Sequence, residues 1–146
     1  MSGDEAPEDP NVRKRLAIKD IMPKTPFIGW LGLVFETYEP DLVVTRLPFR
    51  EELTNDGVVY HGGVVMSVVD TTAAAAAWSN HDFANGSKAS TVSTTVNFVG
   101  AARKSDLLCT ARTVRRAREL IFIEISTTDT DGRPVASAVQ TYRITS

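Results

Sequence analysis

A single acidic residue, Asp70, stands within a run dominated by valine, glycine and alanine that extends from Gly62 to Trp78. Moving an ionised carboxylate into apolar surroundings is costly unless neighbouring groups compensate for its lost hydration. A carboxylate partly shielded from water is also a stronger base, which suits a group that activates water or attacks a carbonyl carbon. Asp70 is therefore the first candidate for a catalytic residue.

Two conformations of this run are compatible with its composition. The β-branched valines could form a strand over residues 60–69, in which case Asp70 would cap a shorter helix after it. The pair Gly62 and Gly63, together with the alanines at 73–77, instead favours a helix that begins near Gly62. In such a helix Asp70 lies about two turns inside and cannot be a cap, while the bare N–H groups of the glycines could meet a ligand.

The composition limits the size and the partners of the protein. The chain has 146 residues, 42% of them hydrophobic and 23% charged, which is enough for one domain with a full core. Its net charge of -2 and pI near 5.7 argue against nucleic acid or a membrane surface as a partner. The acidic N-terminus lacks the features of a signal peptide, and no apolar run is long enough to cross a bilayer. We therefore expect a cytoplasmic protein.

Cysteine and histidine are scarce, since the chain contains only Cys109, His61 and His81. One cysteine cannot form an internal disulfide, and these three residues have no metal-ligand spacing, so we expect neither a metal nor another cofactor. Cys109 alternates with Leu107, which is typical of a buried strand residue. His81 stands in a polar stretch after the apolar run, which predicts a solvated loop residue without a role.

The other segments predict an α+β fold. Residues 1–10 are typical of a flexible tail, and residues 11–22 predict a short surface helix with Asn11 as its N-cap. Strands are predicted over residues 27–38, 41–49 and 90–99, with three more over 106–145 that turn near 116–119 and at 131–132. This order predicts one long helix packed on one face of an antiparallel sheet. Alternation in the strand over residues 90–99 puts Val92, Val96 and Phe98 on one face and Thr91, Ser93, Thr95 and Asn97 on the other.

Three segments carry a resemblance to a known family: NDGVVYHGGVVMSVVD (residues 55–70), STVSTTVNFVGAARKSDL (90–107) and RRARELIFIEISTTDTDGRPVASAVQTYRI (115–144). Over residues 27–145 the chain resembles the PaaI-type acyl-CoA thioesterases of the hotdog-fold superfamily. The resemblance implies a single hotdog domain over residues 11–146, with a long antiparallel sheet wrapped around one central helix. It also implies hydrolysis of an aryl- or fatty-acyl-CoA at the interface of a homodimer, alone or within a dimer of dimers.

The resemblance assigns roles to individual residues. Asp70 matches the family's acid, a nucleophile or a general base, and Gly62, with Gly63 beside it, matches the backbone donor that polarises the thioester carbonyl. Asn55 matches the residue that orients the water or the acid. Thr91 matches a hydroxyl residue beside the acid.

His61 and the basic residues are further candidates for substrate binding. In the family the residue matching His61 holds the loop by hydrogen bonding, whereas in related dehydratases it is the base. The guanidinium group of arginine is well suited to binding phosphate. The resemblance implies that several members of a local basic cluster bind the nucleotide phosphates of coenzyme A. The alternative is that these residues are solvated charges at a strand edge. The cluster consists of Arg103, Lys104, Arg115, Arg116 and Arg118.

Three functions are therefore open: an acyl-CoA thioesterase, a hydratase or dehydratase that uses His61, and an acyl-CoA binding protein without activity. Helix geometry adds one constraint on the first. At about 1.5 Å per residue, Gly62 and Asp70 are about 12 Å apart along the helix, whereas both must lie within about 3.5 Å of one carbonyl group. We therefore expect a composite site, with Asn55 and Gly62 from one chain and Asp70 and Thr91 from its partner.

Overall fold

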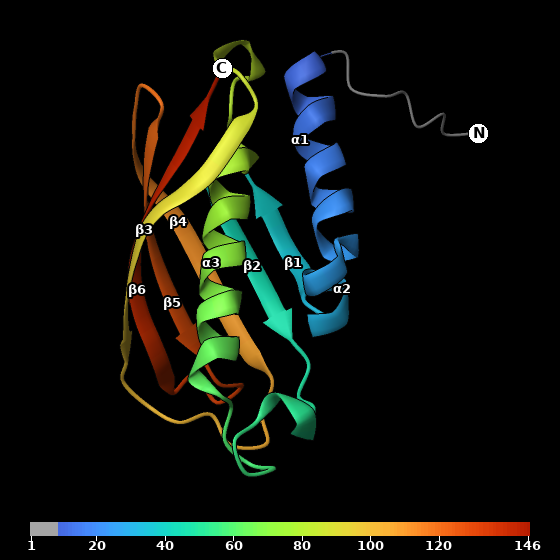
Figure 1. Ribbon diagram of the computed structural model, residues 1–146, viewed down its shortest axis with the longest axis vertical. Helices are drawn as coiled ribbons and strands as arrows, with labels where there is room; N and C mark the ends of the chain where they lie inside the picture. Colours follow the sequence, from blue (N-terminus) through green and yellow to red (C-terminus); the bar gives the residue numbers. More distant parts are fainter. Residues whose placement is uncertain (1–8) are drawn as a thin grey trace, which may run out of the picture.

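The computed structural model describes residues 9–146 as one six-stranded antiparallel sheet with the long helix α3 along its inner face (Figure 1). The strand order is β1-β2-β4-β5-β6-β3, so β1 and β3 are the two edges. Helix α1 lies beside α3 near the β1 edge (Figure 1). This is the predicted α+β class and the hotdog arrangement. In chain order the elements are α1 (Pro10–Ile21), η1 (Met22–Lys24), α2 (Pro26–Leu31), β1 (Val34–Glu39), β2 (Leu42–Leu47), η2 (Glu51–Leu53), α3 (Gly62–Ser79), η3 (Phe83–Asn85), β3 (Lys88–Phe98), β4 (Leu107–Ala117), β5 (Leu120–Thr128) and β6 (Pro134–Thr145).

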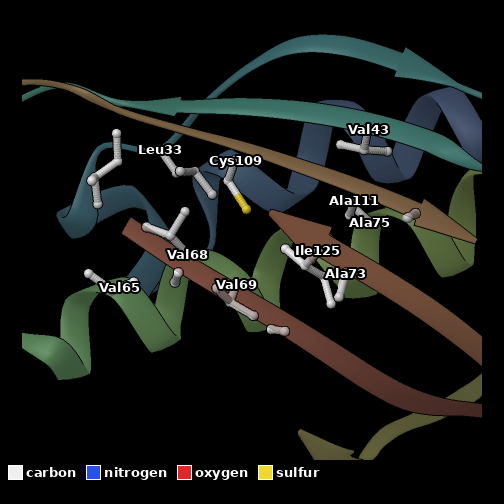
Figure 2. Packing of buried hydrophobic residues seen from close by; sticks show 14 of the residues in the cluster. Leu33, Val43, Val65, Val68, Val69, Ala73, Ala75, Cys109, Ala111 and Ile125 are labelled. Atoms are coloured by element: carbon white, nitrogen blue, oxygen red, sulfur yellow. The ribbon is translucent and has the colours of Figure 1, made fainter. Parts of the chain in front are cut away.

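The apolar run is a helix, so the helix prediction is confirmed and the strand alternative is wrong. Its buried residues recur at helical spacing, and Figure 2 shows Val68 and Val69 of α3 beside Cys109 and Ile125 of the sheet. Small alanines follow, which lets the second half of the helix approach the strands closely. Among residues 9–146, no helix is both long enough and apolar enough to cross a membrane.

The predicted turns between the last three strands are confirmed. The β4–β5 connection passes through Arg118, whose φ of 55° is left-handed, and the β5–β6 connection contains Gly132 at φ 79°. Asp41, at φ 63°, lies in the turn between β1 and β2. These turns place β4, β5 and β6 side by side beneath α3.

Two predictions for the N-terminal region are wrong. The first half of the strand predicted over residues 27–38 is the helix α2, because Pro26 occupies its first turn and Gly32, at φ 82°, ends it with a left-handed cap. The cap of α1 is Asp9, whose side chain accepts from the N–H of Asn11. The tail predicted over residues 1–10 falls outside the described residues as far as residue 8, while Asp9 and Pro10 belong to the start of α1.

Strand β3 has a bulge that strict alternation did not predict. Among the described strands it pairs only with β6, and its register shifts between Thr91 and Ser93. A bulge adds one residue to a strand, so the faces reverse across it. Thr91 therefore faces α3 together with Thr94. The prediction that Thr91 shares a face with Ser93 is wrong for this reason.

Candidate active site

Asp70 lies on the face of α3 that the sheet does not cover. Its side chain is exposed in the single chain, so the residues of this chain alone do not give the carboxylate the shielding from water that its apolar neighbours suggested. The Thr91 hydroxyl donates to Asp70 Oδ1 at 2.7 Å. That bond holds one carboxylate oxygen, and no donor from residues 9–146 reaches Oδ2. Asp70 thus presents an oriented, open oxygen to its surroundings.

A groove of 480 Å³ lies between α3 and the edge strand β3. Apart from Asp70, its lining consists of glycine, methionine and small hydroxyl side chains. Strand β3 follows the helix for the length of this groove: Thr91 contacts Asp70, while the Phe98 ring lies beside Gly62, 3.6 Å from where a Cβ would stand. The lining residues are Gly63, Met66, Ser67, Asp70, Thr91 and Thr94.

The start of α3 offers one free backbone donor. His61 is the N-cap, and its Nδ1 accepts from the Gly63 N–H at 2.8 Å. A Cβ on Gly63 would lie 2.9 Å from the same Nδ1, so this cap requires glycine there. The Gly62 N–H has no acceptor in the described part of the chain. Of the two predicted glycines, Gly62 is the one able to polarise a carbonyl group, at the positive end of the helix dipole.

The geometry of His61 does not favour a role as a catalytic base. Because Nδ1 accepts a backbone hydrogen bond, the neutral ring carries its proton on Nε2, and neither nitrogen is then free to accept a proton from a substrate. Its position fits the supporting role that the family resemblance implies. In this arrangement His61 does not offer the free ring nitrogen that a dehydratase base would need.

Asn55 lies in a loop that folds back onto the start of α3. The loop closes where the His61 N–H donates to the Leu53 carbonyl and the Asn55 N–H donates to the Val59 carbonyl, both at 3.0 Å. Asp56 holds the turn by accepting from two backbone N–H groups, which lowers the pKa of its carboxyl group. The Asn55 side chain is exposed, and it belongs to the same end of the molecule as Gly62.

The predicted site residues therefore form two groups within one chain. Asp70 and Thr91 meet at the middle of α3, while Asn55, His61, Gly62 and Gly63 gather at its start. About 12 Å of helix separates the groups, because Asp70 comes eight residues after Gly62 and each residue adds about 1.5 Å along the axis. A single chain cannot bring both groups to one carbonyl carbon.

The prediction of one local basic cluster is wrong. Arg103 and Lys104 precede β4 and bridge to the Asn55 loop, whereas Arg115 and Arg116 lie among the last residues of β4 and Arg118 lies just after it. A strand of 11 residues is about 35 Å long, so the two groups lie at opposite ends of α3.

Arg116 is already engaged within the chain. Its guanidinium donates two bonds to Asp41 Oδ1, at 2.9 and 2.7 Å, and one to the Ala77 carbonyl at the end of α3, at 2.9 Å. A cation is favourable at this negative end of the helix dipole. A phosphate group would have to compete with these bonds, whereas Arg115 and Arg118 are exposed.

Sequence reasoning missed two residues near Asp70. Gln140 of β6 is buried beneath the groove and bonds to both Thr94 and the Asp70 backbone. Tyr142 pairs with Thr91 across the sheet, and burial raises the pKa of its phenol, an effect to which the Asp70 charge adds. Alternation in β6 points both residues toward α3, so the pattern could have identified them as polar groups on a buried face.

His81 is also not the solvated residue that was predicted. It is 5% exposed, and its ring lies against Trp78 and Phe83 while Nε2 bonds to the Gly86 carbonyl at 2.7 Å. Burial lowers the pKa of His81. This histidine lies at the end of α3 remote from Gly62, where it fixes the following loop.

The family model of the thioesterase superfamily matches residues 57–136, which include α3 and most of the sheet. This chain belongs to the thioesterase superfamily. A provisionally named esterase of Saccharolobus solfataricus is 30% identical over 129 residues, which cover 88% of this chain and 90% of that protein. Membership supports a hydrolase of the esterase and thioesterase type.

Solved structures of this superfamily share the fold. A thioesterase family protein from Silicibacter pomeroyi is 26% identical, with a TM-score of 0.79 over 89% of this chain and 98% of that one. The PaaI protein of the E. coli phenylacetic acid degradation operon, at 18% identity, has a TM-score of 0.80 over 92% and 96% of the two chains. A hypothetical thioesterase from Streptococcus pneumoniae, solved with coenzyme A, is 19% identical with a TM-score of 0.75 over 88% and 96%. The last two likenesses concern the fold alone.

Proposed function

We propose that this protein hydrolyses the thioester of an aryl- or fatty-acyl-CoA to the free acid and coenzyme A. The observation that carries the proposal is the Thr91–Asp70 bond of 2.7 Å, which orients a carboxylate in an open groove. Membership in the thioesterase superfamily supports the reaction type. The fold shared with a thioesterase solved with coenzyme A supports the choice of acyl-CoA among thioesters.

The proposed reaction uses Asp70 in one of two ways. As a general base, Asp70 takes a proton from water while the water oxygen attacks the carbonyl carbon, and it then returns the proton to the leaving thiolate. As a nucleophile, Asp70 attacks the carbon itself and forms an anhydride, which water hydrolyses after the C–S bond has broken. In both cases the Gly62 N–H stabilises the oxyanion that forms on the carbonyl oxygen, and Asn55 orients the attacking group.

We propose that the working unit is a homodimer with two shared sites. An isologous dimer with antiparallel α3 helices would place Gly62 and Asn55 of one protomer beside Asp70 and Thr91 of its partner. The edge strand β3 supports this arrangement, because no strand of residues 9–146 pairs with its outer side and because Val92 and Phe98 of this strand are more than half exposed. Pairing two β3 edges would bury this surface.

Release of coenzyme A from a panel of aryl and straight-chain acyl-CoA substrates, followed with a thiol reagent, tests the function. We expect the wild-type chain to release thiol and the Asp70→Asn variant to turn over at least about two orders of magnitude more slowly, the usual scale for a lost base or nucleophile. Thermal unfolding and CoA binding of the variant serve as controls for fold and affinity. Hydrolysis by Asp70→Asn at the wild-type rate on every substrate would exclude the proposed role of Asp70.

A further inference from the structure

The buried amide of Gln140 joins the two walls of the groove from beneath. Gln140 is 2% exposed on the inner face of β6. Its Oε1 accepts from the Thr94 hydroxyl of β3 at 2.7 Å, and its Nε2 donates to the Asp70 carbonyl of α3 at 3.4 Å. The shorter bond anchors the strand, while the longer one reaches the backbone of the residue that carries the carboxylate.

The position of Thr94 makes this anchor relevant to Thr91. Thr94 pairs directly with Gln140 and comes just after the bulge between Thr91 and Ser93. Strand β3 has a neighbour on one side only, so within residues 9–146 its place over α3 depends on β6 and on few side-chain bonds. The bulge directs Thr91 toward Asp70, and the Thr94–Gln140 bond holds the strand where the bulge ends.

We infer that Gln140 is a positioning residue, which keeps the Thr91 hydroxyl in reach of Asp70 and thereby sets the orientation of the carboxylate. This inference rests on the proposed thioesterase function and assigns Gln140 no contact with the substrate. An amide is suited to the position because it accepts from a hydroxyl and donates to a carbonyl at once. Neither a carboxylate nor an apolar side chain of this length can make both bonds.

The test is hydrolysis of the best acyl-CoA substrate by Gln140→Met, which has similar length and no amide. Small displacements in a site can cost up to about a hundredfold in rate, so we expect kcat to fall by about tenfold, with KM within about threefold of wild type. Thr94→Val removes the other end of the bond and should lower kcat in the same way. Thr95→Val makes the same change on the outer face of β3 and should leave kcat unchanged.

A second background separates positioning from packing. In a Thr91→Val chain there is no hydroxyl to position, so adding Gln140→Met should lower kcat by less than about threefold. An equal loss in both backgrounds would overturn the inference, as would a Gln140→Met or Thr94→Val chain with wild-type kcat. Activity lost in Asp70→Asn but kept in Gln140→Met would overturn only the role of Gln140, whereas a wild-type chain inactive on all acyl-CoA substrates would overturn the proposed function itself.

Discussion

A cysteine at Met66 should form a disulfide with the same residue of a second protomer. If Gly62 of one chain lies opposite Asp70 of its partner along antiparallel helices, the two-fold axis passes halfway between them, at Met66. Packed helices are about 8 to 10 Å apart, and each Cα lies about 2.3 Å from its own axis, which leaves about 3.4 to 5.4 Å between the facing Cα atoms. That separation is close to the range of about 4.4 to 6.8 Å found in disulfides.

The control is Ala74→Cys, eight residues further along the same helix. Its two copies would be about 24 Å apart along the axes, since each chain contributes about 12 Å in opposite directions. The native Cys109 should stay unreactive, because it is fully buried and burial raises the pKa of its thiol. The protein is oxidised at low concentration and separated on a denaturing gel without reductant. We expect dimers for Met66→Cys and single chains for Ala74→Cys and wild type.

Cross-linking of Ala74→Cys with a yield equal to that of Met66→Cys would refute the register of the helices. Single chains from both variants, when the native protein elutes as a dimer, would refute an interface at α3. In either case the composite site would lose its geometric basis, because Gly62 and Asp70 could not then approach one carbonyl group.

Two further predictions concern charged groups remote from Asp70. Replacing Arg115 and Arg118 by alanine should raise KM for acyl-CoA several-fold and leave KM for a short pantetheine thioester unchanged, because only acyl-CoA carries nucleotide phosphates. Equal effects on both substrates would indicate that these arginines have a structural role. Burial lowers the pKa of His81 in the folded chain, so the unfolded chain binds the proton more tightly. As the pH falls below about 6.5, protonation of His81 should therefore reduce the free energy of unfolding, by up to about 1.4 kcal/mol per pH unit. Urea unfolding at about pH 8 and about pH 5.5 should therefore show a smaller loss for His81→Gln than for wild type, and equal losses would contradict this cause.

The helix, the sheet and the first-named candidate could all be predicted from local patterns. Glycines before an alanine-rich run predicted α3, and Asp70 was identified because a lone carboxylate contrasts with its neighbours. The 12 Å spacing along one helix followed from the chain numbering alone. These features depend on short stretches of sequence, where propensity and spacing are sufficient.

The features that could not be predicted depend on contacts between distant segments. The bulge before Ser93 reverses the face to which the Thr91 side chain points. The alternation of polar and apolar residues in the sequence does not indicate where a strand contains such an inserted residue. Five basic residues that are close in sequence lie at two ends of a long strand, because β4 is extended between them. Gln140 lies 70 residues from Asp70, so only the folded sheet shows that the two are hydrogen-bonded.

Restoration of activity in mixed dimers tests the shared site most directly. Asn55→Ala and Asp70→Asn chains are unfolded together and refolded, so about half of the dimers contain one chain of each kind. Each mixed dimer has one site with both defects and one site with neither, so about a quarter of all sites are intact. We predict activity near a quarter of wild type, against almost none for either variant refolded alone. Mixed dimers verified by mass spectrometry that remain as inactive as the separate variants would contradict the shared site.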